Sequence, residues 1–141
     1  MANIELFDEY TARTFASLYE SFPRKKVIDA REICGHSETD EFGSVLNRAG
    51  ERSKHFEVAM ATIEWLIETG YIRAAEMDQY GARDAVLTSQ GLMVLKASPD
   101  SLKPVEGIGD RIARLVHNGS IDAAKEAANA AIALGIGTLF K

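Results

Sequence analysis

The sequence predicts a mainly α-helical protein with one small β-hairpin and a helical C-terminal extension. Three observations support this fold class. Apolar residues recur at helical spacing over 56–68, two short strand-like segments joined by a glycine-containing turn follow over 71–87, and another helical pattern occupies 88–95. Beyond Pro99 and Pro104, which break regular structure, the chain becomes rich in alanine and predicts further helices.

Composition limits the classes of function. The chain has 141 residues, 46% of them hydrophobic, which is enough for a packed core, and its net charge of −5 argues against a general polyanion-binding surface. The single cysteine, Cys34, excludes a disulfide within the chain and suits a reducing compartment. The longest uncharged apolar segment, 130–140, is about half the roughly 20 residues that a membrane span needs. We therefore expect a cytoplasmic protein with no stable membrane insertion.

The first predicted helix covers 3–21 and is followed by a short strand at Val27–Ile28. Asp29 then begins a short second helix as a capping box with Glu32, and Gly35 ends it. One face of the first helix is expected to be buried, and its apolar side is formed by Ile4, Phe7, Tyr10, Thr14, Phe15, Leu18 and Phe22.

Residues 36–52 contain many Gly, Ser, Thr, Asp and Asn residues, which favour turns and loops. This segment is predicted to be an insertion, with one or two helical turns around Phe42, Val45 and Leu46. Ser53 is expected to cap the third helix. The predicted buried row of that helix is Phe56, Met60, Ile63 and Ile67, with Ala59 and Leu66 beside it and Trp65 at an edge. The predicted exposed row is Glu57, Ala61, Glu64 and Glu68.

The hairpin turn is expected at 78–81, where Gly81 supplies positive φ, and Thr88 is expected to cap the fourth helix. In the extension, Asn118 and Gly119 end a helix that starts near Ile108. A last helix, capped by Ser120, is predicted to reach about residue 134, because Gly135 and Gly137 weaken its end.

From Leu18 to about Leu102 the chain resembles the winged helix-turn-helix superfamily. The resemblance is carried by the helix ending Trp65-Leu66-Ile67-Glu68-Thr69-Gly70-Tyr71-Ile72 and by Leu87-Thr88-Ser89-Gln90-Gly91-Leu92. It implies a winged-helix domain over 1–102, with the insertion near 36–52, and a helical extension over 103–141. The whole chain is also similar to small bacterial proteins of uncharacterised function that carry the segment Leu-Tyr-Glu-Ser-Phe-Pro. These motifs specify a fold and leave the function open, because one fold hosts many functions.

One reading of this fold is a DNA-binding transcriptional regulator. The third helix would then enter the major groove, where Arg, Lys, Asn and Gln read base edges. Its exposed row carries three glutamates instead, so phosphate and groove contacts would come from the hairpin, the basic run after Pro23 and the start of the third helix. The residues that this reading assigns to DNA are Arg24, Lys25, Lys26, Arg52, Lys54, Gln79, Tyr80 and Arg83.

A glycine pair opens the fifth predicted helix. The segment Val105–Val116 resembles the hairpin of a helix-hairpin-helix motif, in which glycine amides approach a phosphate. The resemblance assigns that contact to Gly107, Gly109, Arg111 and Arg114. The prolines before it disrupt the leading helix that the motif needs, which favours an ordinary glycine-led helix start.

The other reading is a non-enzymatic interaction or assembly module. The acidic face of the third helix and the small-residue row of the last helix would pair with a partner protein or with a second copy, and we expect a homo-oligomer. The residues assigned to self-association are Ala127, Ala131, Ile132 and Gly135. This interaction reading is preferred, with the DNA regulator as the alternative.

The sequence shows no catalytic constellation and assigns no cofactor. Cys34 and His36 do not share a helix face, and Cys34 is interpreted as a small core residue. The three histidines lack the spacing of a zinc site, and the acidic loop at His36, Glu38, Asp40 and Glu41 is interpreted as solvated surface. We therefore predict no enzyme and no metal site.

Overall fold

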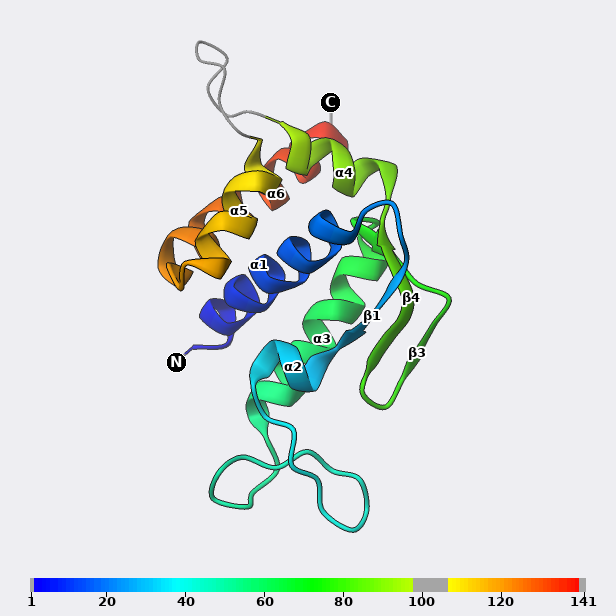
Figure 1. Cartoon of the computed structure of the whole chain (residues 1–141), viewed down its shortest axis with the longest axis vertical. Coiled ribbons are helices and arrows are strands. Elements are labelled where there is room, and N and C mark those ends of the chain that lie inside the picture. Colours follow the sequence, from blue (N-terminus) through cyan, green and yellow to red (C-terminus); the bar gives the residue numbers. More distant parts are fainter. Residues whose placement is uncertain (1, 98–106, 140–141) are drawn as a thin grey trace.

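The protein is mainly helical with a small antiparallel sheet (Figure 1). The computed structural model describes residues 2–97 and 107–139, with side chains described as far as residue 136. The predicted breaks at Pro99 and Pro104 lie outside these residues. The helices are α1 (Asn3–Ser21), α2 (Ala30–Cys34), α3 (Lys54–Glu68), α4 (Ser89–Lys96), α5 (Ile108–His117) and α6 (Ile121–Leu139). The strands are β1 (Lys26–Asp29), β2 (Ile72–Arg73), β3 (Glu76–Asp78) and β4 (Gly81–Leu87).

Strand β4 is the centre of the sheet and pairs antiparallel with β1, β2 and β3. The first strand of the predicted hairpin is divided into β2 and β3, while the turn falls where it was expected. Gly81 has φ +156°, and a Cβ there would lie 2.0 Å from the carbonyl oxygen of Ile28. The hairpin therefore needs glycine at this position to let β1 approach β4.

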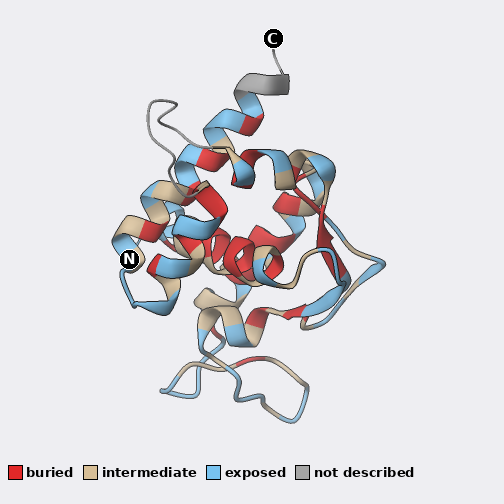
Figure 2. Ribbon diagram, turned by 45° about the horizontal axis from the view of Figure 1, so that its top comes forward, coloured by how far each residue is buried: buried red, intermediate tan, exposed pale blue. Residues whose placement is uncertain are grey.

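Helix α1 passes through the middle of the molecule. It packs against α3 on one side and against α5 and α6 on the other, and the buried positions gather around it (Figures 1 and 2). Leu6, Ala12 and Ala16 are buried in addition to Phe15 and Leu18, whereas Ile4 is 65% exposed. The predicted face is confirmed at Tyr10, Thr14, Phe15 and Leu18, but the prediction missed a second buried side of α1, which the helical extension covers.

Tyr71 joins the end of α3 to α4 and α6. Its hydroxyl donates to the carbonyl of Ile132 in α6 at 2.9 Å, and its own carbonyl accepts from the backbone amide of Thr88 at 3.1 Å. Its ring lies 6.1 Å from that of Phe15 and 6.2 Å from that of Trp65. The side chain is 1% exposed, and burial raises the pKa of the phenol. Four helices therefore meet at one aromatic residue.

Helix α6 continues to Leu139, past the end predicted near residue 134. Gly135 lies inside it, and a Cβ at this position would lie within 2.4 Å of Cε1 of Tyr71 and even closer to the hydroxyl oxygen. Here glycine permits close packing and does not end the helix. The tertiary contact therefore overrides the low helix propensity of glycine.

Two predicted helix caps are confirmed and one is corrected. The hydroxyl of Ser53 accepts from the amide of Phe56 at 3.0 Å, and Thr88 caps α4 in the same way. Asp29 also caps its helix, but it accepts from the amide and guanidinium of Arg31, at 2.9 and 2.7 Å, and not from the amide of Glu32. The capping box was wrong because Arg31 supplies the stronger, charge-assisted partner.

The buried side of α3 is rotated from the predicted row. Ala59, Thr62, Ile63 and Leu66 are buried, whereas Phe56, Met60 and Ile67 are only half-buried. The predicted exposed row of Glu57, Ala61, Glu64 and Glu68 is confirmed. The rotation leaves Trp65 half-buried toward the amino-terminal part of α1.

The segment between α2 and α3 forms two successive turns and no helix, and it extends from the lower end of Figure 1. The side chain of Asp40 accepts from the amides of residues 42 and 44, and that of Asn47 accepts from those of residues 49 and 51. Gly43 and Gly50 follow with positive φ. The prediction of helical turns was wrong because these two side chains accept hydrogen bonds from the backbone amides that would otherwise donate to carbonyls within a helix.

We predict that Gly135→Ala destabilises the protein even though alanine is the better helix former. The added methyl group would collide with Tyr71, so the free energy of unfolding should fall by about 1–3 kcal/mol in urea titrations. Ala133→Gly, at an exposed position of the same helix, is the matched control and should cost about 0.5–1 kcal/mol through helix propensity alone. Stabilisation by Gly135→Ala would contradict the packing of α6 on Tyr71.

Candidate functional site

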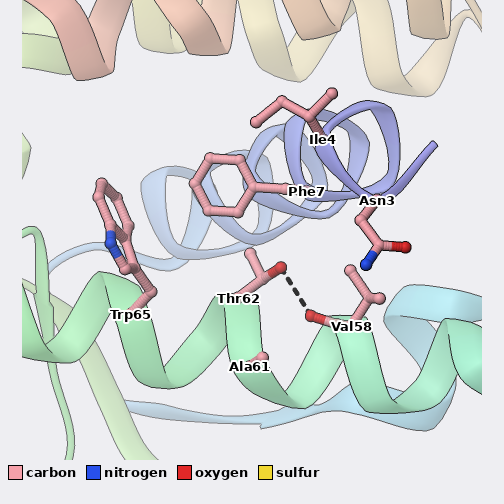
Figure 3. A pocket seen from close by; sticks show the side chains of 7 residues that line it. All are labelled: Asn3, Ile4, Phe7, Val58, Ala61, Thr62 and Trp65. Atoms are coloured by element: carbon pink, nitrogen blue, oxygen red, sulfur yellow. Dashed lines mark hydrogen bonds between the residues drawn. The ribbon is translucent and has the colours of Figure 1, made fainter.

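A groove lies between the amino-terminal end of α1 and the middle of α3 (Figure 3). Its volume is about 560 Å³, within the range of ligand-binding clefts. The residues that line it are Asn3, Ile4, Phe7, Val58, Ala61, Thr62 and Trp65. Two elements far apart in sequence therefore build one apolar depression on the surface.

The aromatic side chains of this groove are fixed by packing. The ring of Phe7 meets that of Trp65 edge to face, with centroids 5.2 Å apart and planes at 89°. The other side of Trp65 stacks on Tyr71 with an interplanar angle of 20°. Because the indole is held on two sides, the groove is already shaped before any ligand binds.

The groove offers few polar atoms to a ligand. The hydroxyl of Thr62 donates to the carbonyl of Val58 at 2.7 Å, as Figure 3 shows, which leaves the amide of Asn3 and the indole N–H of Trp65 as the other polar side-chain groups of the lining. Ile4 is 65% exposed at the rim. Such a surface suits an apolar side chain of a partner better than a charged metabolite.

Carboxylates border this groove on the α3 side. Ala61 belongs both to the lining and to the exposed row of α3, where Glu57, Glu64 and Glu68 are its neighbours on the same helix face. The resulting surface is apolar in the centre and negatively charged at one edge. It repels a polyanion and attracts a cationic partner.

The hairpin residues assigned to DNA are partly engaged within the chain. Arg83 forms ion pairs with Glu76 at 3.4 Å and with Asp78 at 3.2 Å, so its charge is compensated locally. The guanidinium of Arg31 lies 3.9 Å from the ring centroid of Tyr80. Gln79 is exposed at the tip of the turn. The hairpin therefore presents less free positive charge than its sequence suggests.

The other predicted DNA contacts fall into two groups. Arg24, Lys25 and Lys26 are exposed around the start of β1. Arg52 and Lys54 line a second hollow at the beginning of α3. Among the described residues, no hollow of the surface is lined by both of these groups together with Arg83.

The glycine pair of α5 is explained by packing. A Cβ at Gly109 would lie 2.8 Å from the ring of Tyr19, and one at Gly107 would lie 3.0 Å from the carbonyl oxygen of Leu95. Arg111 and Arg114 are exposed on the same helix. The glycines thus allow α5 to approach α1 and α4, which accounts for them without a bound phosphate.

The predicted self-association row of α6 is largely used inside the chain. Ala131 is buried and Gly135 lies against Tyr71, whereas Ala127 and Ile132 are half-buried. The side of α6 that faces outward carries Ala130, Ala133 and Leu134. A contact between two copies through the predicted row would have to rely on Ala127 and Ile132.

Reactive groups do not cluster in the described part of the chain. No set of three His, Cys, Asp or Glu side chains there could hold a metal ion. Cys34 is half-buried, and burial raises the pKa of its thiol, which disfavours the nucleophilic thiolate. His117 is paired with Glu20 at 2.5 Å.

Sequence periodicity did not identify the groove, because Ile4 and Phe7 share the helical spacing of the buried residues of α1. A signal was nevertheless present. The first turn of α1 carries the apolar residue Ile4, and the row opposite it on α3 contains the small residue Ala61 between Glu57 and Glu64. Where the apolar first turn of one helix packs beside a small residue such as Ala61 of another, the space that a larger side chain would fill can remain as a depression on the surface.

No protein family model matches the chain, and neither the curated proteins nor the solved structures give a match. Among the helices that the structure describes, none combines the length and the apolar character that crossing a membrane requires.

We predict that the Asp29–Arg31 pair, which adjoins Tyr80, stabilises the fold in a pH-dependent way. The hydrogen bonds from Arg31 lower the pKa of Asp29 below its ordinary 3.8, against the opposing effect of burial. The stabilisation should therefore be complete above pH 3.8 and disappear as the pH falls through the lowered value.

Two substitutions at this position separate the charge from the cap. Asp29→Ala should reduce the free energy of unfolding by about 1 kcal/mol at neutral pH because it removes the cap. Asp29→Asn keeps the cap and should cost less, and its difference from the wild type should vanish in acid. Equal losses for both variants at every pH would contradict this assignment.

Proposed function

We propose that this protein is a non-catalytic interaction module that binds a helical segment of a partner protein in the groove between α1 and α3. The observation that most supports this function is the combination of a fixed apolar lining with carboxylates along the adjacent face of α3. Helices commonly bind in such grooves through apolar side chains spaced by three or four residues.

The charge of the border indicates the chemistry of the partner. An apolar helix face would contact Phe7, Ala61 and Trp65, and flanking lysine or arginine side chains would face Glu57 and Glu64. Opposite charges at the rim mainly increase the association rate and exclude acidic competitors. We therefore assign the groove to a basic amphipathic helix.

A second copy of this chain is a poorer occupant. In a two-fold dimer through this groove, the same patch would face itself, so the glutamates of both α3 helices would approach one another. Like charges placed opposite each other oppose such pairing. The proposed partner is consequently a different protein, and the sequence-based expectation of a homo-oligomer does not extend to this surface.

In the same proposal, residues 1–102 form a winged helix-turn-helix domain and residues 103–141 its helical extension. The supporting features are the order α1, β1, α2, α3 and hairpin, and the pairing of β1 with β4 beside that hairpin. The face of α3 that reads DNA in such domains is here the face that carries the glutamates and borders the groove.

DNA binding is the alternative function. The observation that favours it is the exposure of Arg24, Lys25 and Lys26 next to the hairpin, since exposed cations supply phosphate contacts. The local pairing of Arg83 and the acidic face of α3 oppose it. The two functions predict opposite preferences for cationic and anionic ligands.

Trp65 provides the test because it is the only tryptophan of the chain and lines the groove. We predict that a synthetic leucine–lysine amphipathic helix shifts the tryptophan emission to shorter wavelength in a saturable manner. A leucine–glutamate peptide with the same apolar face should bind at least about tenfold more weakly. A mixed-sequence DNA duplex should leave the emission unchanged at low salt.

Two single substitutions test whether the peptide binds in the groove between α1 and α3. Ala61→Arg places a long cationic side chain in the groove and should weaken the lysine peptide about tenfold or more, whereas Met93→Arg adds the same charge at an exposed position of α4 and should not. Equal binding of both peptides, or duplex binding that falls steeply with salt, would overturn the proposed function. Light scattering on the same samples should report a protein monomer before the peptide is added.

A further inference from the structure

A second hollow lies where the loop between α2 and α3 meets the start of α3. Its volume is about 490 Å³. The residues that line it are His36, Asn47, Arg48, Ala49, Glu51, Arg52, Lys54 and His55. Three permanent cations and two imidazoles therefore face one space together with a single carboxylate.

The wall of this hollow is a defined turn. The side chain of Asn47 accepts from the amides of Ala49 and Glu51 at 2.9 and 3.1 Å, and Gly50 has φ +81°. The backbone bridge between Leu46 and Arg52 closes the turn. Arg48 and Arg52 are thus presented by the same short, hydrogen-bonded segment.

Within the described residues, none of these three cations forms an ion pair, although Glu51 belongs to the same lining. The ion pairs of this part of the molecule do not include Arg48, Arg52 or Lys54. With neutral imidazoles, three cations and Glu51 give the hollow a formal charge of +2, in a protein whose net charge is −5. A concentration of unpaired positive charge on an acidic protein points to an anionic ligand.

The two imidazoles add hydrogen-bonding capacity. The ring of His36 stacks on that of His55 at 4.9 Å, and its Nδ1 lies 2.5 Å from the hydroxyl oxygen of the buried Ser53. Burial, followed by the charges of His55 and Arg48, lowers the pKa of His36. A bound anion would counteract those effects and favour the protonated ring.

We propose that this hollow binds the phosphate group of a small phosphorylated molecule. Arginine matches phosphate because its planar guanidinium can donate two parallel hydrogen bonds, and Arg48 and Arg52 supply two such groups beside Lys54. A phosphomonoester carries close to two negative charges at neutral pH, which matches the charge of the hollow. The site shares no lining residue with the groove between α1 and α3, so it stands independently of the proposed function.

The test uses the three histidines as reporters in proton NMR. Titration of the full chain with glycerol phosphate should give saturable shifts of the His36 and His55 ring signals and raise the pKa of His36, while the ring signals of His117 stay unchanged. The titratable and charged groups around His36 are Cys34, Arg48, Glu51, Arg52, Lys54 and His55.

Variants and competing anions make the test specific. Arg48→Gln with Arg52→Gln should weaken the binding about tenfold or more, whereas Arg73→Gln, at an exposed position of β2, should not. Unchanged tryptophan emission would show that each variant is folded. Equal shifts of all three histidines, equal shifts with sodium chloride at the same ionic strength, or the absence of shifts would overturn the proposal. Tighter binding of a DNA duplex than of glycerol phosphate would overturn the assignment to a small molecule.

Discussion

The burial of Tyr71 is the interaction on which the arrangement of the helices depends. Its hydroxyl holds α6, its ring lies against Phe15 of α1 and Trp65 of α3, and its carbonyl accepts from Thr88 at the start of α4. Because Trp65 is pressed between Tyr71 and Phe7, the same packing that joins the extension to the rest of the molecule also shapes the groove. The extension is therefore part of the core that supports the proposed binding surface.

Positive and negative charges are concentrated on different parts of the surface. The exposed face of α3 carries Glu57, Glu64 and Glu68 beside an apolar groove, while the loop before α3 gathers cations around a separate hollow. The hairpin compensates its own Arg83 with two carboxylates. A protein built to lie along DNA would combine its cations on one side of the domain, whereas here the exposed face of α3 carries three glutamates and the cations are divided among separate places. This distribution supports a protein partner.

The elements that sequence reasoning predicted best are those determined by local chemistry. The cap at Ser53, the turn at Gly81 and the exposed row of α3 follow from hydrogen bonding, backbone conformation and helical period. The features that it missed depend on contacts between distant segments. The exposure of Ile4 and the helical state of Gly135 follow from how α1 and α6 pack, which no local pattern encodes. The two turns before α3 were predictable, because Asp40-x-x-Gly43 is repeated seven residues later as Asn47-x-x-Gly50.

Mapping of amide chemical shifts with the leucine–lysine peptide tests the central claim most directly, because it reports where a ligand binds on the intact chain. The account predicts that the largest changes at saturation fall on the first two turns of α1 and on the face of α3 around Ala61 and Trp65. Amides of the hairpin around Arg83 should change little. A map centred on the hairpin and the run 24–26, or saturation without changes in α1 and α3, would contradict the account.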